Sequence, residues 1–152
     1  MPLSHLEHIL VQTADIERTR DWYVRVLGMT AGHTPDFKFP VCWLYIGERD
    51  VIHITEGGAN TTANRKAYLG QQSDAVSGSG VIDHIGFRCT GLAATMEHLR
   101  TLNVPFNERQ VDDQGLYQLF LFDPNGIKIE LNFANVEAQG LRAEVLASNL
   151  SS

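Results

Sequence analysis

The spacing of apolar residues near the start of the chain changes from that of a strand to that of a helix. The segment LEHILVQT (residues 6–13) alternates apolar and polar positions, which is typical of a β-strand with one buried face. The segment TADIERTRDWYVRVLG (residues 13–28) has its apolar residues three or four positions apart, which predicts an amphipathic helix. Asp15 is placed to cap the start of this helix, and Gly28 is placed to end it.

Two further strands complete this first unit, and the second half of the chain repeats the same order. VCWLYIG and VIHITE both alternate as strands and are separated by the turn ERD. Corresponding points of the two halves, such as His8 and His84, lie 75 to 77 residues apart, which indicates two copies of one structural unit. The expected elements of the second half are the strands VIDHIGFRC, VPF, LYQLFLF and IKIELNF, the helix TGLAATMEHLRTLN and a tight turn at DPNG.

The segment between the two units, residues 57–80, is rich in Gly, Ser, Asn and Thr, and we expect it to be a loop. A loop of this length is either a linker or a mobile cover over a functional site. Arg65, Lys66 and Tyr68 are the side chains with which a cover could contact a substrate. The tail after Phe133 predicts a helix that packs on the rest of the chain or on a second subunit. The apolar positions of this helix are Val136, Leu141, Val145 and Leu146.

Strand alternation decides which polar side chains share a face. In the first strand, His8 and Gln12 lie on the face opposite Ile9 and Val11. In the last strand, Glu130 belongs to a polar row that alternates with an apolar row. The apolar rows must lie under the helices, so we expect the polar rows to line the concave side of each sheet. Each unit then carries a histidine on its first strand and a possible metal ligand on its last, His53 in one unit and Glu130 in the other.

Two imidazoles and one carboxylate suit Fe(II), Mn(II), Zn(II), Co(II) or Ni(II). His8, His84 and Glu130 are therefore candidate ligands of one divalent transition metal. His53 is open to three interpretations: a fourth ligand, a general base beside the metal, or an ordinary strand residue. Arg88 lies four residues after His84 and so on the same face, where it could clamp a substrate carboxylate or enolate, or pair with an acidic neighbour.

The composition narrows the kinds of partner. Apolar residues make up 43% of the chain, which is enough for a folded core, and the net charge is -6. The twelve Lys and Arg residues are spread thinly, so a nucleic-acid partner is not expected. The chain shows neither a signal sequence nor a membrane-spanning run, so we expect a cytoplasmic protein. Cys42 and Cys89 are not spaced as a redox pair, which favours buried structural thiols.

The chain resembles the vicinal oxygen chelate superfamily, which includes glyoxalases, bleomycin-resistance proteins and extradiol dioxygenases. The motifs that carry the resemblance are LEHILVQTADIERTRDWYVRVLGM, IDHIGF and FDPNGIKIEL. The resemblance covers residues 5 to about 134. It implies an α+β fold with two tandem βαβββ modules, about 5–56 and 81–134, that form a curved mixed sheet around a metal site in a single domain. By position it implies the ligands His8, His84 and Glu130, with His53 where glyoxalase I commonly has a glutamate.

The sequence departs from two branches of this superfamily. Bacterial glyoxalase I has an arginine for glutathione where this chain has Gln12, so glutathione conjugates are not the expected substrates, and Gln12 itself is a candidate substrate contact. Extradiol dioxygenases usually have an acid–base histidine and a tyrosine at positions that here hold Gly70, or its neighbour, and Phe120. Tyr117 or His53 could take over these roles, with Tyr117 also a candidate substrate contact.

The resemblance therefore implies a metal-dependent isomerase or lyase that chelates a small substrate through vicinal oxygens and stabilises an enolate-type intermediate. Glu130 or His53 would move the proton. The alternatives are an extradiol-type dioxygenase using Fe(II) or Mn(II), and a non-catalytic protein that binds a drug or metabolite. Because the edges of open curved sheets must be covered, we expect a homodimer, with the metal bound within one chain or between chains.

Overall fold

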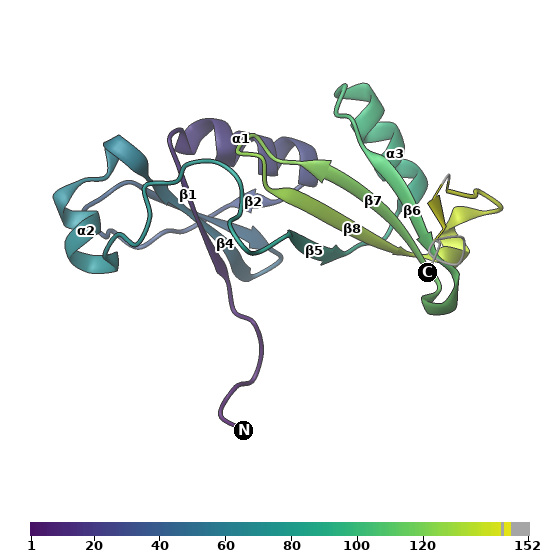
Figure 1. Cartoon of the computed structure of the whole chain (residues 1–152), viewed down its shortest axis with the longest axis horizontal. Helices are drawn as coiled ribbons and strands as arrows, with labels where there is room; N and C mark the ends of the chain where they lie inside the picture. Colours follow the sequence, from purple (N-terminus) through teal and green to yellow (C-terminus); the bar gives the residue numbers. More distant parts are fainter. Residues whose placement is uncertain (144, 147–152) are drawn as a thin grey trace. The chain divides into compact units, whose positions relative to one another are not determined.

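The computed structural model describes residues 1–143 and 145–146 of the chain (Figure 1). The chain divides into two compact units, Met1–Gly78 and Ser79–Ser152. The division falls inside the polar segment that the sequence places between the two repeats. Each unit has its own sheet and its own buried apolar residues.

The first unit is a four-stranded mixed sheet with one helix packed on it. The strand order is β1-β4-β3-β2, in which β1 and β4 are parallel and the other pairs are antiparallel. The helix α1 packs on β3 and β4. The elements are β1 (Ile9–Thr13), α1 (Ile16–Leu27), β2 (Thr30–Ala31), β3 (Val41–Ile46), β4 (Arg49–Glu56), the short 3₁₀ helix η1 (Gly58–Asn60) and α2 (Ala63–Leu69).

The ends of α1 are those predicted from the sequence. The Asp15 side chain accepts a hydrogen bond of 3.0 Å from the backbone N–H of Arg18, which satisfies one of the free donors of the first turn. Gly28 ends the helix with a φ of 73°, a left-handed conformation that glycine adopts without a steric penalty. Between these caps, Tyr23 and Val26 are buried on the face that the helical spacing predicted.

The second unit repeats this plan with a larger sheet. Among its described residues, the strand order is β5-β8-β7-β6-β9, with β5 and β8 parallel. The helix α3 buries Leu92, Met96 and Leu99, as expected, and Asn103 takes the left-handed conformation after its end. The elements are β5 (His84–Arg88), α3 (Leu92–Thr101), β6 (Asn107–Val111), η2 (Asp112–Gln114), β7 (Leu116–Phe122), β8 (Lys128–Ala134), η3 (Asn135–Ala138) and β9 (Val145–Leu146).

Strand register makes the two units equivalent residue by residue. His53 lies opposite Leu10, two residues after His8, and Glu130 lies opposite Gly86, two residues after His84. The antiparallel neighbours correspond as well, because β3 pairs Trp43 with His53 and β7 pairs Phe120 with Glu130. The predicted α+β fold with two similarly built modules is confirmed, although each module has a sheet of its own.

Three local predictions were wrong. The segment 57–80 contains the helices η1 and α2, because Thr62 caps α2 by accepting from the Arg65 N–H and Gly70 ends it with a φ of 72°. VPF is not a strand, since β6 begins only at Asn107. In the tail, η3 covers Asn135–Ala138, and Val145–Leu146 pair with β6 as a short parallel strand in place of the expected helix.

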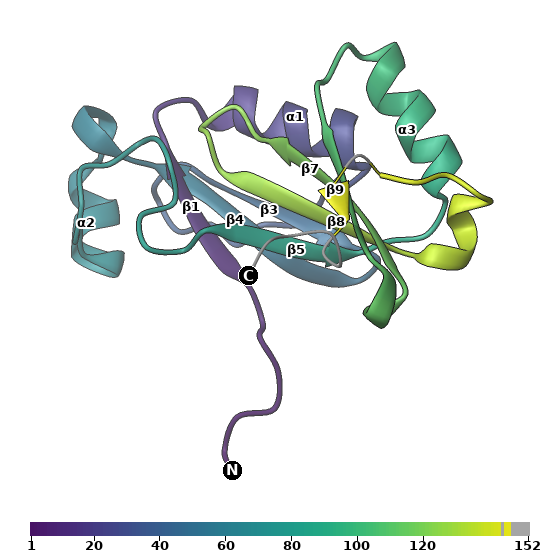
Figure 2. The same cartoon turned by 45° about the vertical axis from the view of Figure 1, so that its right-hand side comes forward.

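The tail folds back on the second unit for a reason that lies in α3. The N-terminal cap of α3 is Gly91, which has no side chain to accept from the free N–H groups of the first turn. Glu137 of η3 supplies that acceptor, since its Oε1 lies 2.8 Å from Gly91 N and 3.1 Å from Leu92 N. Figure 2 shows η3 beside the start of α3. Within the described residues, no helix has the length and apolar character needed to span a membrane.

Candidate functional site

His84 and Glu130 face each other across two adjacent strands of the second unit. β5 and β8 run parallel, and their register places Gly86 opposite Glu130. His84 Nε2 and Glu130 Oε2 lie 2.8 Å apart. The Glu130 side chain is largely buried, with 13% of it exposed, whereas that of His84 is 38% exposed. The two residues that the sequence assigned to one polar face are therefore in direct contact.

Neighbouring polar groups fix the orientation of this pair. His84 Nδ1 lies 2.8 Å from Asp83 Oδ1. The amide groups of Gln118 and Asn132 donate to Glu130 Oε1 over 2.9 and 2.7 Å. Because one oxygen of Glu130 is held by two amides, the other oxygen is directed at His84.

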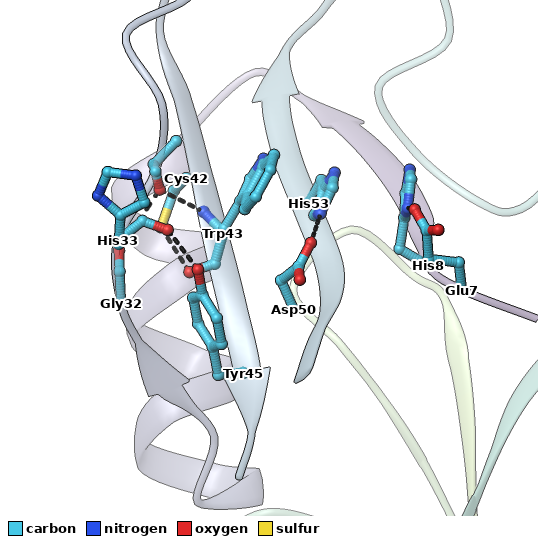
Figure 3. A network of polar contacts seen from close by, with 10 residues as sticks. Glu7, His8, Gly32, His33, Cys42, Trp43, Tyr45, Asp50 and His53 are labelled. Atoms are coloured by element: carbon cyan, nitrogen blue, oxygen red, sulfur yellow. Dashed lines mark hydrogen bonds and ion pairs between the residues drawn. The ribbon is translucent and has the colours of Figure 1, made fainter. Parts of the chain in front are cut away.

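The equivalent residues of the first unit are arranged differently. The rings of His8 and His53 stack with centroids 3.9 Å apart and planes inclined by 17°. On its other side, His53 stacks on Trp43 at 4.2 Å with planes inclined by 5°. Figure 3 shows the three rings in a row on neighbouring strands. The row follows from the strand order β1-β4-β3, which sets these side chains side by side on one face.

His53 is held by a carboxylate as well as by the two rings. Its Nε2 lies 2.7 Å from Asp50 Oδ2. The pKa of Asp50 is lowered, chiefly by this hydrogen bond. An ionised carboxylate only accepts, so the Nε2 of His53 carries the proton and Nδ1 keeps its lone pair. Burial lowers the pKa of His53 more than the bond to Asp50 raises it, so we expect a neutral imidazole at neutral pH.

The His84–Glu130 pair fits a pair of metal ligands. Ligand atoms that share one metal at bond lengths of about 2.1 Å lie roughly 3 Å apart. Metal-binding histidines generally have their other ring nitrogen hydrogen-bonded to a carboxylate or carbonyl, which is the position of Asp83. A metal ion between Nε2 and Oε2 would replace the proton that this contact requires.

The His8–His53 pair does not have this arrangement. Imidazole lone pairs lie in the ring plane, so those of two stacked rings run nearly parallel and do not converge on one point. The two imidazoles therefore lie in a stack, and whether His53 is a ligand, a general base or an ordinary strand residue stays a prediction. Among the residues that the structure describes, no three or more His, Cys, Asp or Glu side chains form a metal-binding group.

A cavity of about 210 Å³ opens beside the stack in the first unit. Its walls are formed mainly by rings from three segments: the loop before β3, the strands themselves and α2. Leu10, Val41 and Leu69 complete the lining, in which no Asp, Glu, Lys or Arg of the described part of the chain takes part. The ring-bearing residues are His8, Phe37, Phe39, Trp43, His53 and Tyr68.

Gln12, a predicted substrate contact, has both ends of its amide occupied. Its oxygen accepts from Arg65 Nη2 at 3.0 Å, and its nitrogen donates to the carbonyls of Ser73 and Ala75 at 2.9 and 2.6 Å. Arg65 is 4% exposed, and its Nη1 donates to the Gly70 carbonyl. Gln12 therefore ties α2 and the following loop to β1, and we do not place it in the substrate site.

Tyr117 and Arg88 lie on opposite faces of the second sheet. Tyr117 belongs to the buried row of β7, and its hydroxyl donates to Glu108 Oε1 at 3.0 Å. That row alternates with the one that carries Gln118, so Tyr117 points away from Glu130 and is left out of the proposed site. Arg88 is exposed at the end of β5, on the face of His84, where the alternation predicted it.

Several residues of this site were missed by reasoning from the sequence. Trp43 and Phe120 could have been found, because they occupy equivalent places in the two repeats. Gln118 also had a signal, since it alternates with the apolar row of β7. Asp50 and Phe37 had none, because the turn and loop that carry them show no periodicity. The two thiols, Cys42 and Cys89, are free and half-buried.

Comparison with known proteins gives a consistent result. The family model "Glyoxalase/Bleomycin resistance protein/Dioxygenase superfamily" matches residues 5–131. The chain is 24% identical over 132 residues to Glyoxylase I 4 of Arabidopsis thaliana, covering 85% of this chain and 70% of that one. It is 26% identical over 142 residues to a lactoylglutathione lyase of Pseudomonas putida, covering 82% of each.

A solved structure has the same fold. The lactoylglutathione lyase from Agrobacterium tumefaciens superposes with a TM-score of 0.66 at 14% identity, covering 90% of this chain and 98% of that one. Because the family model covers most of the chain, the assignment does not depend on any single relative. The chain belongs to the glyoxalase/bleomycin resistance protein/dioxygenase superfamily.

Proposed function

We propose that this protein is a metal-dependent lyase or isomerase that acts on a small molecule with two vicinal oxygens. The observation that carries the proposal is the His84–Glu130 pair, with its atoms 2.8 Å apart and its outer contacts to Asp83, Gln118 and Asn132. Such outer contacts are what a metal ligand pair needs in order to keep its geometry. The Glu130 carboxylate, of which 13% is exposed, is therefore oriented by contacts on both of its oxygens.

The remaining ligand in this proposal is His8, the counterpart of His84 by strand register. The divalent metal would supply Lewis acidity, stabilising the negative charge that develops on the substrate oxygens. His53 is the proposed base, because its Nδ1 keeps a lone pair while Asp50 holds the opposite side of the ring. Glu130 is less suited to proton transfer, since both of its oxygens are already engaged. Arg88 is the proposed contact for a negatively charged substrate group.

The proposal is tested first by metal content. Protein purified without added metal is analysed by elemental analysis and then titrated with Ni²⁺, Zn²⁺ and Fe²⁺. We expect one metal per chain in the unmodified protein, and loss of stoichiometric binding in His84→Ala and Glu130→Gln. The control Glu97→Gln removes an exposed carboxylate of α3 and should bind normally. Full metal occupancy in Glu130→Gln would show that the ligand assignment is wrong.

The same experiment separates the alternative functions. Nickel, zinc or cobalt in the purified protein supports isomerase or lyase chemistry. Iron or manganese, together with oxygen consumption on addition of a catechol, would replace the proposal with a ring-cleaving dioxygenase. A protein that takes up no metal and binds a small molecule tightly would be a binding protein.

A further inference from the structure

We infer that the cavity of the first unit holds a planar aromatic group without an anionic substituent, about one ring in size, that the substrate carries next to its vicinal oxygens. This inference rests on the proposed function, because His8 is both a proposed metal ligand and a wall of the cavity. A substrate chelated at His8 would therefore extend its adjacent substituent into this space.

The chemistry of the walls selects an aromatic occupant. Phe37 lies 5.4 Å from Tyr68, 5.7 Å from Phe39 and 6.0 Å from Trp43, measured between ring centroids. The planes of the two rings in each pair are inclined to each other by 32° to 48°. The rings are therefore not stacked face to face. Aromatic pairs in this range of distances attract each other beyond the effect of area burial, and a planar guest can make the same contacts.

The lack of a cationic side chain in the described lining argues against an anionic group. Among the described residues no Asp, Glu, Lys or Arg lines the cavity, and the lining residues that carry a polar group are His8, Trp43, His53 and Tyr68. Placing an anionic group among these rings would remove its hydration without a cationic side chain to replace it. A carboxylate or phosphate on the substituent is therefore excluded.

The volume selects the size of the group. An apolar cavity of about 150 Å³ holds one benzene molecule. The cavity here, at about 210 Å³, has room for one ring with a small substituent.

The cavity wall contributed by α2 is already in place before a ligand binds. Arg65 joins α2 to Gln12 of β1, and the Glu56 carboxylate accepts from Thr62 N, the cap of the helix, at 2.8 Å. Tyr68 is thereby held against Phe37 and Phe39. Because this wall is preformed, binding orders few side chains and costs little conformational entropy. We therefore expect the cavity to prefer an aromatic ring of a ligand over an aliphatic one even when no metal is present.

The test compares three neutral hydroxyketones that share the same chelating end. They are 2-hydroxyacetophenone, its cyclohexyl analogue and hydroxyacetone, titrated by calorimetry into protein treated with a chelator. We expect the phenyl compound to bind about tenfold more tightly than the cyclohexyl compound, and hydroxyacetone to bind more weakly than both. Equal affinities for the phenyl and cyclohexyl compounds would overturn the inference.

Variants locate the effect in the cavity. Tyr68 is 67% exposed, so Tyr68→Ala should fold normally, and we expect it to reduce the phenyl affinity at least fivefold while Tyr68→Phe retains it. The control Phe122→Leu removes an exposed ring of the second unit and should change nothing. An unchanged affinity in Tyr68→Ala would also overturn the inference. Because these titrations contain no metal, failure of the proposed metal site leaves the ring preference intact, and the two results can be told apart.

Discussion

The imidazole of His84 and the carboxylate of Glu130 depend on residues that would not themselves bind a metal. The side-chain NH2 group of Gln118 donates both to Glu130 Oε1 and to Asn132 Oδ1, so a single amide links two side chains of the polar row. Without it, the carboxylate could rotate on its strand. The orientation of the ligand pair is therefore a property of the row as a whole and not of the two residues alone.

We predict that Gln118→Leu weakens metal binding about 10- to 100-fold without unfolding the protein, because the outer contact of Glu130 is lost while the shape of the side chain is nearly kept. The measurement is a calorimetric titration with Zn²⁺. Gln114→Leu, an exposed position of η2, is the matched control. Metal affinity equal to that of the unmodified protein would mean that the Gln118 amide has no part in positioning the ligand.

Tyr117 gives a prediction of pH dependence. Its pKa is raised from 10.0 to about 12, first by burial and then by the hydrogen bond to Glu108. Since the folded pKa lies above the unfolded one, the stabilising contribution is fully present below pH 10 and is lost as the pH rises toward 12. A shift of this size corresponds to a loss on the order of 2–3 kcal/mol.

Tyr117→Phe should remove that part of the alkaline destabilisation. Urea unfolding at several pH values between 9 and 12 measures this effect. At neutral pH we expect the variant to be about 1 kcal/mol less stable than the unmodified protein, because it lacks the hydrogen bond to Glu108. If the variant and the unmodified protein lose stability equally above pH 10, the phenol is not the group responsible.

At the scale of elements, the helix α2 shows how a polar segment becomes ordered. Its large apolar side chains, Tyr68 and Leu69, are exposed, and its buried residue is Arg65. The helix is held by hydrogen bonds: Thr62 caps it, and Arg65 joins it to Gln12. The Nε of Arg65 is buried without a partner among the described residues, so the guanidinium is tied by its two terminal nitrogens. Such a segment depends strongly on each of these few contacts.

We predict that Gln12→Ala makes backbone amides of residues 63–76 exchange with deuterium at least tenfold faster, because α2 and the loop after it lose their attachment to β1. The strands β3 and β4 should exchange as before. Gln72→Ala, an exposed neighbour in the same loop, serves as the control. Unchanged exchange at residues 63–76 would mean that ring packing by Tyr68 is sufficient to hold the helix.

At the scale of the whole molecule, a proposed metal ligand lies at one edge strand of each sheet. In the first sheet the edge strand β1 begins next to His8, and in the second the edge strand β5 begins with His84. Edge strands have free backbone N–H and C=O groups, and proteins cover or protect them. Exposed apolar side chains lie beside both edges, including Leu10, Val81 and Ile82.

We predict that the protein is a homodimer in which these edges are covered. Light scattering coupled to gel filtration at micromolar concentration gives the mass directly, against 16.9 kDa for one chain. Replacing Val81 and Ile82 with Lys should favour the monomer. A stable monomer of the unmodified protein would exclude a metal site shared between chains.

The sequence by itself determined the type and order of most elements and the faces of the strands. These follow from local periodicity, because alternation and helical spacing depend on residues only a few positions apart. His84 and Glu130 could be assigned to one face for this reason, and the repeat supplied the equivalence of His8 with His84 and of His53 with Glu130. The structure of the tail could not be predicted in this way, because Glu137 accepts a hydrogen bond from the backbone N–H at the start of α3, which lies more than forty residues away in the chain.

Only the tertiary structure decided what surrounds His53. The alternation of apolar and polar residues along β4 is the same whether the His53 side chain binds a metal or stacks between two rings. Its surroundings depend on the strand register that brings Trp43 opposite it and on the turn that brings Asp50 to its Nε2. The cavity, likewise, needs Phe37 and Tyr68 from segments without periodicity to meet over one face of the sheet. Such contacts depend on long-range packing and on the shape of the turns, and the spacing of apolar residues predicts neither of these.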